Sequence, residues 1–146
     1  MNHEDHEEAR RKKKMGLRIA SDLPEKHEQL IQRVIGAAIE VHRHLGPGFL
    51  ESIYERALCH ELKLQAIPFE KQVEILVPYK DISIPGQRVD LIIDEFLVLE
   101  LKAVEDILPI HEAQLLSYLK STELKIGLII NFKVKQLKSG IRRIIL

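Results

Sequence analysis

Cysteine is nearly absent from this chain, which contains Cys59 alone, and tryptophan is missing altogether. A single cysteine excludes a disulfide framework and a cysteine-rich zinc site. No apolar run approaches the roughly 18 residues that a membrane span needs, and the acidic N-terminus lacks the apolar segment of a secretory signal. Glycine (7) and proline (6) are also few, while 45% of residues are hydrophobic, which excludes global disorder. We therefore expect a cytoplasmic protein with no membrane partner.

The length of 146 residues favours one domain. A chain of this size can bury roughly 70% of its unfolded surface, so it needs neither a metal nor a disulfide to fold. Residues 1–23 carry an acidic cluster followed by a basic run, and we expect a charged tail that either pairs as a short helix or stays disordered. The folded domain is expected over residues 24–146.

Net charge is also absent, since 22 basic residues balance 22 acidic ones. The charged residues are nevertheless distributed unevenly along the chain. Residues 1–50 hold 9 basic and 8 acidic residues, residues 51–108 hold 6 and 12, and residues 109–146 hold 7 and 2. An acidic centre beside a basic end is typical of a metal site next to a phosphate-binding surface. Ordinary solvated faces explain the same counts.

Apolar residues recur at three- and four-residue spacing in two segments, which predicts helices over residues 24–45 and 49–65. Gly46, Pro47 and Gly48 separate them, because proline cannot continue a helix. Cys59 is expected near the apolar stripe of the second helix as a small buried side chain. A third helix is predicted over residues 109–122, with Pro109 in its first turn.

Alternating and continuous apolar runs predict strands over residues 69–79, 89–93, 97–102 and 125–132. Residues 81–87 contain proline and glycine and are expected to form a loop. Residues 141–146 are expected to form either an edge strand or a short helix. The resulting order is α-α-β-β-β-α-β, which predicts an α/β fold with a single mixed β-sheet flanked by helices.

The candidate chemistry lies in the segment that contains Asp90, Glu100 and Lys102. Glu100 and Lys102 are two residues apart on a strand and point to one face. Two carboxylates can hold a hard cation such as Mg²⁺, and a lysine can position water or offset charge on a phosphate. Such a charged pair between apolar neighbours is costly to desolvate unless it is partnered or bound to metal.

The hairpin between these two strands decides whether the carboxylates meet. A two-residue turn at Asp94 and Glu95 places Asp90 and Glu100 on opposite faces of the sheet. They converge if the loop has an odd number of residues, such as Asp94, Glu95 and Phe96, or if a bulge intervenes.

Three further residues are candidates for the same site. Gln114 and Tyr118 lie four apart and share a helix face, from which they can hydrogen-bond a phosphate or orient water. Tyr118 is equally well explained as a core aromatic residue. Glu51 either adds a third carboxylate or favours the positive end of its own helix, and its position alone favours the helix-end role.

The segment Gly48-Phe49-Leu50-Glu51-Ser52-Ile53-Tyr54 resembles the signature of the GxxExxY protein family. The resemblance covers residues 31–145 and includes LELKAV and HEAQLLSYLK. That family looks like a member of the PD-(D/E)XK nuclease superfamily. The resemblance implies Asp90, Glu100 and Lys102 as the acidic-acidic-lysine core. It also implies that Gln114 and Tyr118 match the QxxxY element of the RecB-like branch, and that Glu51 matches its helical glutamate.

Two departures from the family pattern are visible. Arg88 and Val89, rather than a proline, precede Asp90, and residues 80–88 form a compact segment that could reshape the entrance to the site. Many superfamily members lack that proline.

We therefore predict a phosphodiesterase that depends on Mg²⁺ or Mn²⁺ and cleaves DNA, with RNA as the second choice. Asp90, Glu100 and Glu51 are the expected metal ligands, and Lys102, Gln114 and Tyr118 act beside them. The phosphate backbone is expected to contact the basic residues after the last buried strand, namely Lys133, Lys135, Lys138, Arg142 and Arg143. The alternatives are a catalytically silent module that binds nucleic acid or protein, and a subunit active only in a complex. A homo-oligomer is also compatible with the sequence.

Overall fold

The computed structural model describes residues 23–146. Along this part of the chain the elements are α2 (Glu25–Leu45), α3 (Glu51–Leu64), β1 (Phe69–Tyr79), β2 (Ile82–Ile93), β3 (Leu97–Lys102), α4 (Pro109–Thr122), β4 (Ile126–Asn131), the 3₁₀ helix η1 (Leu137–Gly140) and β5 (Ile141–Ile145). The predicted α/β fold with one mixed sheet is confirmed. For the end of the chain, where a strand and a short helix were both possible, the structure has a strand over residues 141–145. The tail predicted over residues 1–23 lies outside the described residues, except for Leu23.

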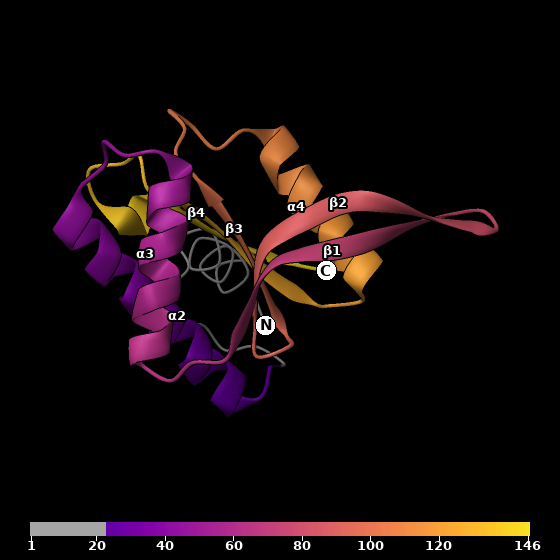
Figure 1. The fold of residues 1–146 in the computed structure, drawn as a ribbon, viewed down its shortest axis with the longest axis horizontal. Helices are drawn as coiled ribbons and strands as arrows, with labels where there is room; N and C mark the ends of the chain where they lie inside the picture. The colour runs from indigo at the N-terminus through magenta and orange to yellow at the C-terminus, as the bar shows by residue number, and fades with distance from the viewer. Residues whose placement is uncertain (1–22) are drawn as a thin grey trace, which may run out of the picture.

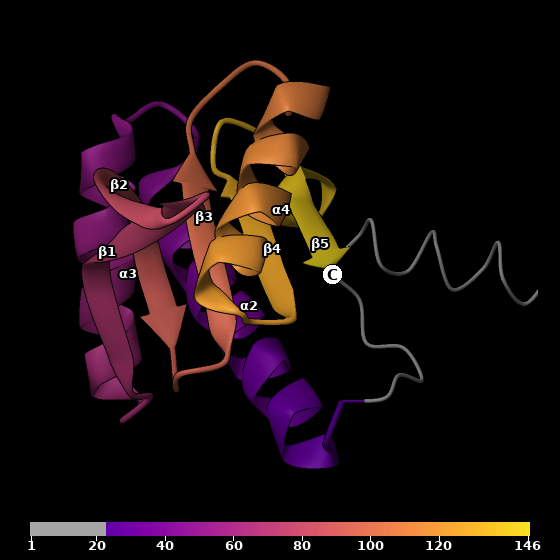
Figure 2. The same cartoon turned by 90° about the vertical axis from the view of Figure 1, so that its right-hand side faces the viewer.

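In the described part of the chain, five strands form one sheet in the order β1-β2-β3-β4-β5. The β3–β4 pair is parallel, and the other neighbouring pairs are antiparallel. Helices α2 and α3 cover one face of the sheet and α4 covers the other (Figures 1 and 2). Because α4 connects the parallel strands β3 and β4, it forms the crossover that a parallel pair requires.

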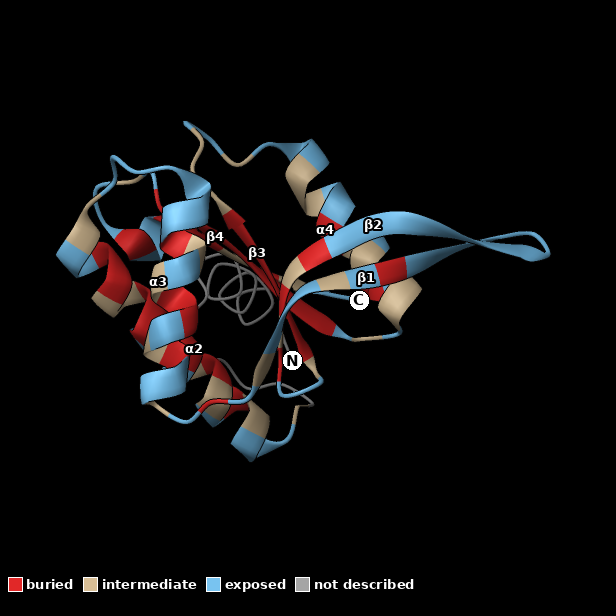
Figure 3. Cartoon of the chain, viewed as in Figure 1, coloured by how far each residue is buried: buried red, intermediate tan, exposed pale blue. Residues whose placement is uncertain are grey.

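Alternation along the strands divides the core into two layers. Leu97, Leu99 and Leu101 of β3 are buried under α2 and α3. Val98 of the same strand packs with Leu115 and Leu119 of α4 on the opposite face. Both faces of β3 and β4 are therefore apolar and covered, as Figure 3 shows by the buried residues of the central strands. A charged residue in β3 then needs a specific environment to remain there.

The β1–β2 hairpin extends well beyond the rest of the molecule and is exposed along its outer part (Figures 1 and 3). The loop predicted for residues 81–87 is wrong, because β2 begins at Ile82. Pro85 and Gly86 lie within the strand, where the register shifts between the pairs Ile75–Gln87 and Val77–Ile84. A bulge leaves residues outside the regular ladder, so it accommodates both a proline without an N–H and Gly86 with φ of 111°.

The turn between α2 and α3 is fixed from within by Tyr54. Its hydroxyl donates to the carbonyl oxygen of Gly46 and accepts from the N–H of Phe49 at 3.1 Å. The ring is fully buried and stacks on Phe132, with the ring centroids 4.4 Å apart. Gly46 has φ of 71°, a left-handed conformation that favours glycine. Tyr54 therefore ties the start of α3 to the core, and with it the position of Glu51.

No helix of residues 23–146 is both long and apolar enough to span a membrane.

Candidate functional site

Asp90 and Glu100 lie opposite each other on one face of the sheet. Ile93 pairs with Leu97 and Leu91 pairs with Leu99, so the same register places Asp90 across from Glu100. The connecting turn contains Asp94, Glu95 and Phe96. Its first two residues have positive φ, and the N–H of Phe96 donates to the carbonyl oxygen of Ile93 at 3.0 Å. Of the two predicted ways for the carboxylates to meet, an odd loop or a bulge, the structure has the odd loop.

At the point where β2 and β3 separate, the two carboxylates take the place of backbone carbonyl groups as hydrogen-bond acceptors. The N–H of Asp90 donates to Oε1 of Glu100 at 3.1 Å, and the N–H of Leu101 donates to Oδ2 of Asp90 at 2.8 Å. Each side chain thus satisfies a backbone donor of the opposite strand, which fixes its orientation. The remaining oxygens, Oδ1 of Asp90 and Oε2 of Glu100, are the ones that can bind a ligand.

Glu100 has the most strongly perturbed carboxyl group of the site. Burial in β3 raises its pKa from 4.5 to about 8, and the charge of Asp90 adds to the rise. The hydrogen bond from the Asp90 N–H and the positive charge of Lys102 oppose it. A buried carboxylate next to another one is costly to ionise, and a cation placed between them removes that cost. Lys102 is half-buried two residues further along the same face.

Glu51 reaches the same group of charges from the first turn of α3. Burial raises its pKa, the charge of Asp90 adds to the rise and that of Lys102 opposes it. The structure therefore brings Glu51 into the electrostatic field of Asp90, Glu100 and Lys102. The sequence alone favoured a helix-end role for Glu51.

Two residues that the sequence did not single out connect α3 to Asp90. The amide Nε2 of Gln72 donates to Oε1 of Glu55 at 2.6 Å and to Oδ1 of Asp90 at 3.4 Å. Gln72 lies in β1 opposite Asp90 and has φ of 51°, which is costly for a residue with a side chain. Burial raises the pKa of Glu55, and the charge of Asp90 raises it further. The spacing of Glu51 and Glu55 on one helix face could have revealed the glutamate, but no sequence pattern marks Gln72.

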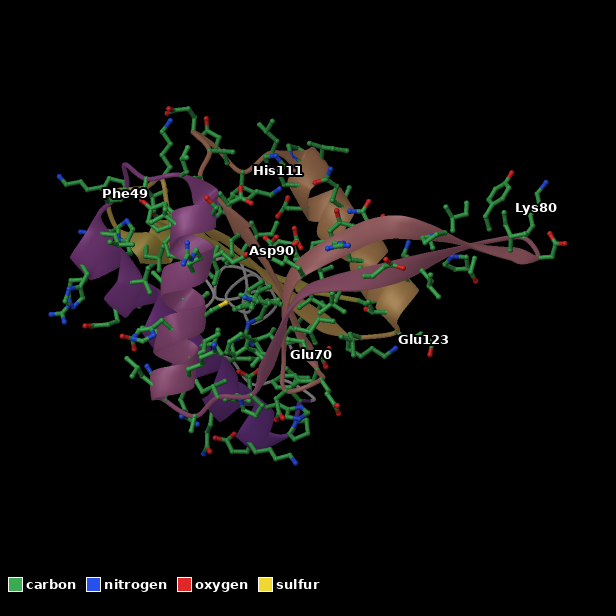
Figure 4. All side chains as sticks on the ribbon, viewed as in Figure 1. Phe49, Glu70, Lys80, Asp90, His111 and Glu123 are labelled. Atoms are coloured by element: carbon green, nitrogen blue, oxygen red, sulfur yellow. The ribbon has the colours of Figure 1, made fainter. Side chains whose placement is uncertain are left out.

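Tyr118 of α4 lies on the other side of the carboxylates. Burial raises its pKa, and the charges of Glu100 and Asp90 add to the rise, while its hydroxyl accepts a hydrogen bond from Nε2 of Gln87 at 2.9 Å. Gln114 is exposed one turn earlier on the same helix. In Figure 4, Asp90 lies between α3 and α4, and the His111 label marks the start of α4. His111 Nδ1 accepts from the N–H of Leu108 at 3.0 Å, so this histidine acts as a helix cap.

The donor set matches a hard divalent cation. Among residues 23–146, no three carboxylate, imidazole or thiol side chains already lie close enough to hold a metal ion. Asp90, Glu100 and Glu51 nevertheless offer only oxygen ligands, which Mg²⁺ and Mn²⁺ prefer. Burial is the main cause of the raised pKa values of Glu100 and Glu51, and the negative charge of Asp90 adds to both, so a cation bound among these carboxylates would favour their ionised forms. Residues of this type in this arrangement fit a divalent metal.

A comparison with models of protein families shows which family this chain belongs to. The profile of the PD-(D/E)XK nuclease superfamily matches residues 28–144, most of the chain. The chain belongs to the PD-(D/E)XK nuclease superfamily. Neither the curated proteins nor the solved structures give a significant match. Membership of the superfamily carries a nuclease-type function with a nucleic acid as substrate, and PD-(D/E)XK nucleases usually use divalent metals, typically Mg²⁺.

The basic residues after β4 differ in burial and in the partners that they contact. Arg143 is buried in an ion pair with Glu28, with Nη1 and Oε1 2.8 Å apart, so its predicted contact with nucleic acid is wrong. Arg142 donates to two backbone carbonyl oxygens, and Lys133 pairs with Glu105 at 2.7 Å. Lys135 and Lys138 line a cavity of about 460 Å³ next to His42 and Arg43 of α2.

Proposed function

We propose that this member of the PD-(D/E)XK superfamily is a metal-dependent nuclease that hydrolyses phosphodiester bonds in DNA. The observation that supports this most directly is the Asp90–Glu100 pair, which sits in register at the point where β2 leaves β3. Both side chains are oriented by backbone donors, which leaves Oε2 of Glu100 and Oδ1 of Asp90 for a ligand; the latter also has a long contact with Nε2 of Gln72 at 3.4 Å. RNA is the second choice of substrate.

Asp90 and Glu100 are the proposed ligands of Mg²⁺ or Mn²⁺, with Glu51 as a third. When bound there, the cation would polarise the scissile phosphate and acidify a bound water. Lys102 lies two residues from Glu100 on the same face, where its ammonium group can hold the attacking water or offset negative charge on the phosphate. Tyr118 and Gln114 are proposed to hydrogen-bond the phosphate from α4.

We further propose that the chain is a GxxExxY protein of the RecB-like branch. Support comes from Gly48, Glu51 and Tyr54, which match the signature. In this chain Tyr54 fixes the turn that precedes Glu51. The four-residue spacing of Gln114 and Tyr118 on α4 supports the branch.

The test is cleavage of labelled single-stranded and double-stranded DNA in Mg²⁺ or Mn²⁺ by the wild type, Asp90→Asn and Glu100→Gln. Both substitutions retain an oxygen acceptor for the backbone donors, whereas alanine would leave the N–H of Leu101 unpaired. The matched control is Glu74→Gln, which removes an exposed carboxylate of β1. We expect cleavage by the wild type and the control, and loss of at least roughly 10²-fold in the two site variants.

The alternatives give different results in this assay. A catalytically silent module binds DNA but does not cleave it, whichever metal is added. In that case Asp90→Asn binds DNA as tightly as the wild type. A subunit that is active only in a complex binds the cation at Asp90 and Glu100 but does not cleave DNA alone. Cleavage of equal rate in Asp90→Asn and the wild type would contradict the proposed site.

A further inference from the structure

A groove of about 560 Å³ lies between α3 and β1, outside the carboxylate site. Its walls carry Arg56 and Lys63 from α3 and Lys71 from β1, all of them exposed. Cys59 also lines the groove and is buried, and burial raises the pKa of its thiol, which disfavours the reactive thiolate. The groove is thus lined by three cationic side chains.

None of these three cations forms a salt bridge within the described residues, although the charge of Lys71 acts against the rise that burial causes in the pKa of the neighbouring Glu55. Within residues 23–146, no carboxylate lies within 4 Å of the charged nitrogens of Arg56, Lys63 or Lys71. Lys133 and Arg143 of the C-terminal segment are, in contrast, held by Glu105 and Glu28. Unpaired cations that line a concave surface attract a polyanion more strongly than cations already neutralised by a neighbour.

The groove is connected to the carboxylate site by hydrogen bonds through Glu55 and Gln72. Glu55 lines the groove and accepts the amide of Gln72 at 2.6 Å, and the same amide reaches Oδ1 of Asp90 at 3.4 Å. One glutamine side chain therefore separates the groove from the proposed metal ligand.

We propose that the groove between α3 and β1 binds the phosphate backbone of one DNA strand through Arg56, Lys63 and Lys71 and leads that strand to Asp90 and Glu100. This inference rests on the proposed nuclease function and adds the path of the substrate. Arg56 and Lys63 are separated by about 10 Å along α3, at 1.5 Å per residue. A strand that rises by about 3.4 Å per nucleotide covers this distance in about three nucleotides. The contacts are to phosphates, so they hold the strand without reading its sequence.

The salt dependence of binding tests this path. The full chain is compared with the variant R56Q/K63Q/K71Q and with the charge-matched control K26Q/K120Q/K125Q, whose three lysines are exposed elsewhere on the surface. Binding of a short DNA strand and of its duplex is measured against NaCl concentration, with Ca²⁺ in place of Mg²⁺ to suppress cleavage. Each lost phosphate contact flattens the slope of log affinity against log salt by about 0.7 for a single strand and about 0.9 for a duplex.

We expect the groove variant to lose up to about 2 from the slope on the single strand and up to about 2.7 on the duplex. The control variant should keep the wild-type slope. Thermal unfolding and Mn²⁺ titration of both variants check that the fold and the carboxylate site are intact. A wild-type slope in the groove variant, in a protein that does cleave DNA, overturns the groove and leaves the nuclease function standing. A wild type that neither binds nor cleaves DNA overturns both.

Discussion

Glu100→Gln should stabilise the metal-free protein at alkaline pH, although it changes a buried residue of the proposed site. The pKa of Glu100 is raised to about 8 in the folded state, against an ordinary value of 4.5. The folded state therefore keeps its proton over a pH range in which the unfolded state has lost it. Folding free energy linked to this proton is fully present below pH 4.5 and is lost as the pH rises to about 8.

The size of the effect follows from the difference between the two pKa values. At about 1.4 kcal/mol for each pH unit, the interval from 4.5 to about 8 corresponds to at most roughly 5 kcal/mol. Water entry and relaxation around the ionised group reduce this, so we expect a gain of about 2–4 kcal/mol for Glu100→Gln at pH 8.5. For a chain of this length, that raises the unfolding temperature by roughly 5–15 °C.

The assay is thermal or urea unfolding of metal-free wild type and Glu100→Gln between pH 5 and pH 9. Gln retains an oxygen that can accept the N–H of Asp90, so the ladder contact is kept. The two stability curves should lie close together near pH 5 and separate as the pH rises. Glu74→Gln, which removes an exposed carboxylate, should follow the wild-type curve.

A divalent cation supplies the second arm of this experiment. Mg²⁺ or Mn²⁺ should stabilise the wild type at pH 8.5, because binding to the folded state alone shifts the unfolding equilibrium. It should stabilise Glu100→Gln much less. Parallel pH curves for the two metal-free proteins, or a Glu100→Gln variant that is less stable at pH 8.5, would refute the reasoning about burial and repulsion at this carboxylate.

Four further outcomes can be checked independently. Lys102→Met should lower single-turnover cleavage by roughly 10²-fold, with cation affinity unchanged or higher, and an unchanged rate would make this lysine structural. Gln72→Gly suits the positive φ of this position but removes the amide that contacts Asp90. It should weaken Mn²⁺ affinity or activity by roughly 10-fold or more, as for other residues that orient metal ligands. Equal Mn²⁺ affinity by calorimetry and an equal cleavage rate would exclude an orienting role for Gln72. Tyr54→Phe should cost about 1–3 kcal/mol in urea unfolding, because its hydroxyl joins two backbone groups of a turn, and a loss below about 0.5 kcal/mol would count against it. Replacing Lys135 and Lys138 with Gln should flatten the duplex salt slope by up to about 2, and an identical slope would remove them from the interface.

The sequence predicted the core elements well where periodicity and turn chemistry agreed. The strand at residues 69–79 and the helix at residues 109–122 have the predicted bounds. The alternation of side chains also predicts that Asp90 and Glu100 meet only across an odd hairpin loop or a bulge, and the structure has the odd loop.

The remaining features depend on contacts between distant segments. Pro85 and Gly86 suggested a loop, but a bulge in a long hairpin absorbs both of them. Gln72 joins Glu55 to Asp90 only because β1 pairs with β2 beside α3, and nothing in its local sequence shows this. Arg143 belongs to a basic cluster in the sequence, yet its place opposite the buried Glu28 removes it from the surface.

Calorimetric titration of Mn²⁺ into the wild type and Asp90→Asn tests the central claim most directly, namely that Asp90 and Glu100 together hold a divalent cation. The account predicts a binding event in the wild type that is lost or greatly weakened in Asp90→Asn. At pH 7 it also predicts that the apparent heat depends on the ionisation enthalpy of the buffer, because Glu100, with a pKa of about 8, must release its proton. Equal Mn²⁺ binding by the two proteins, with no proton released, would contradict it.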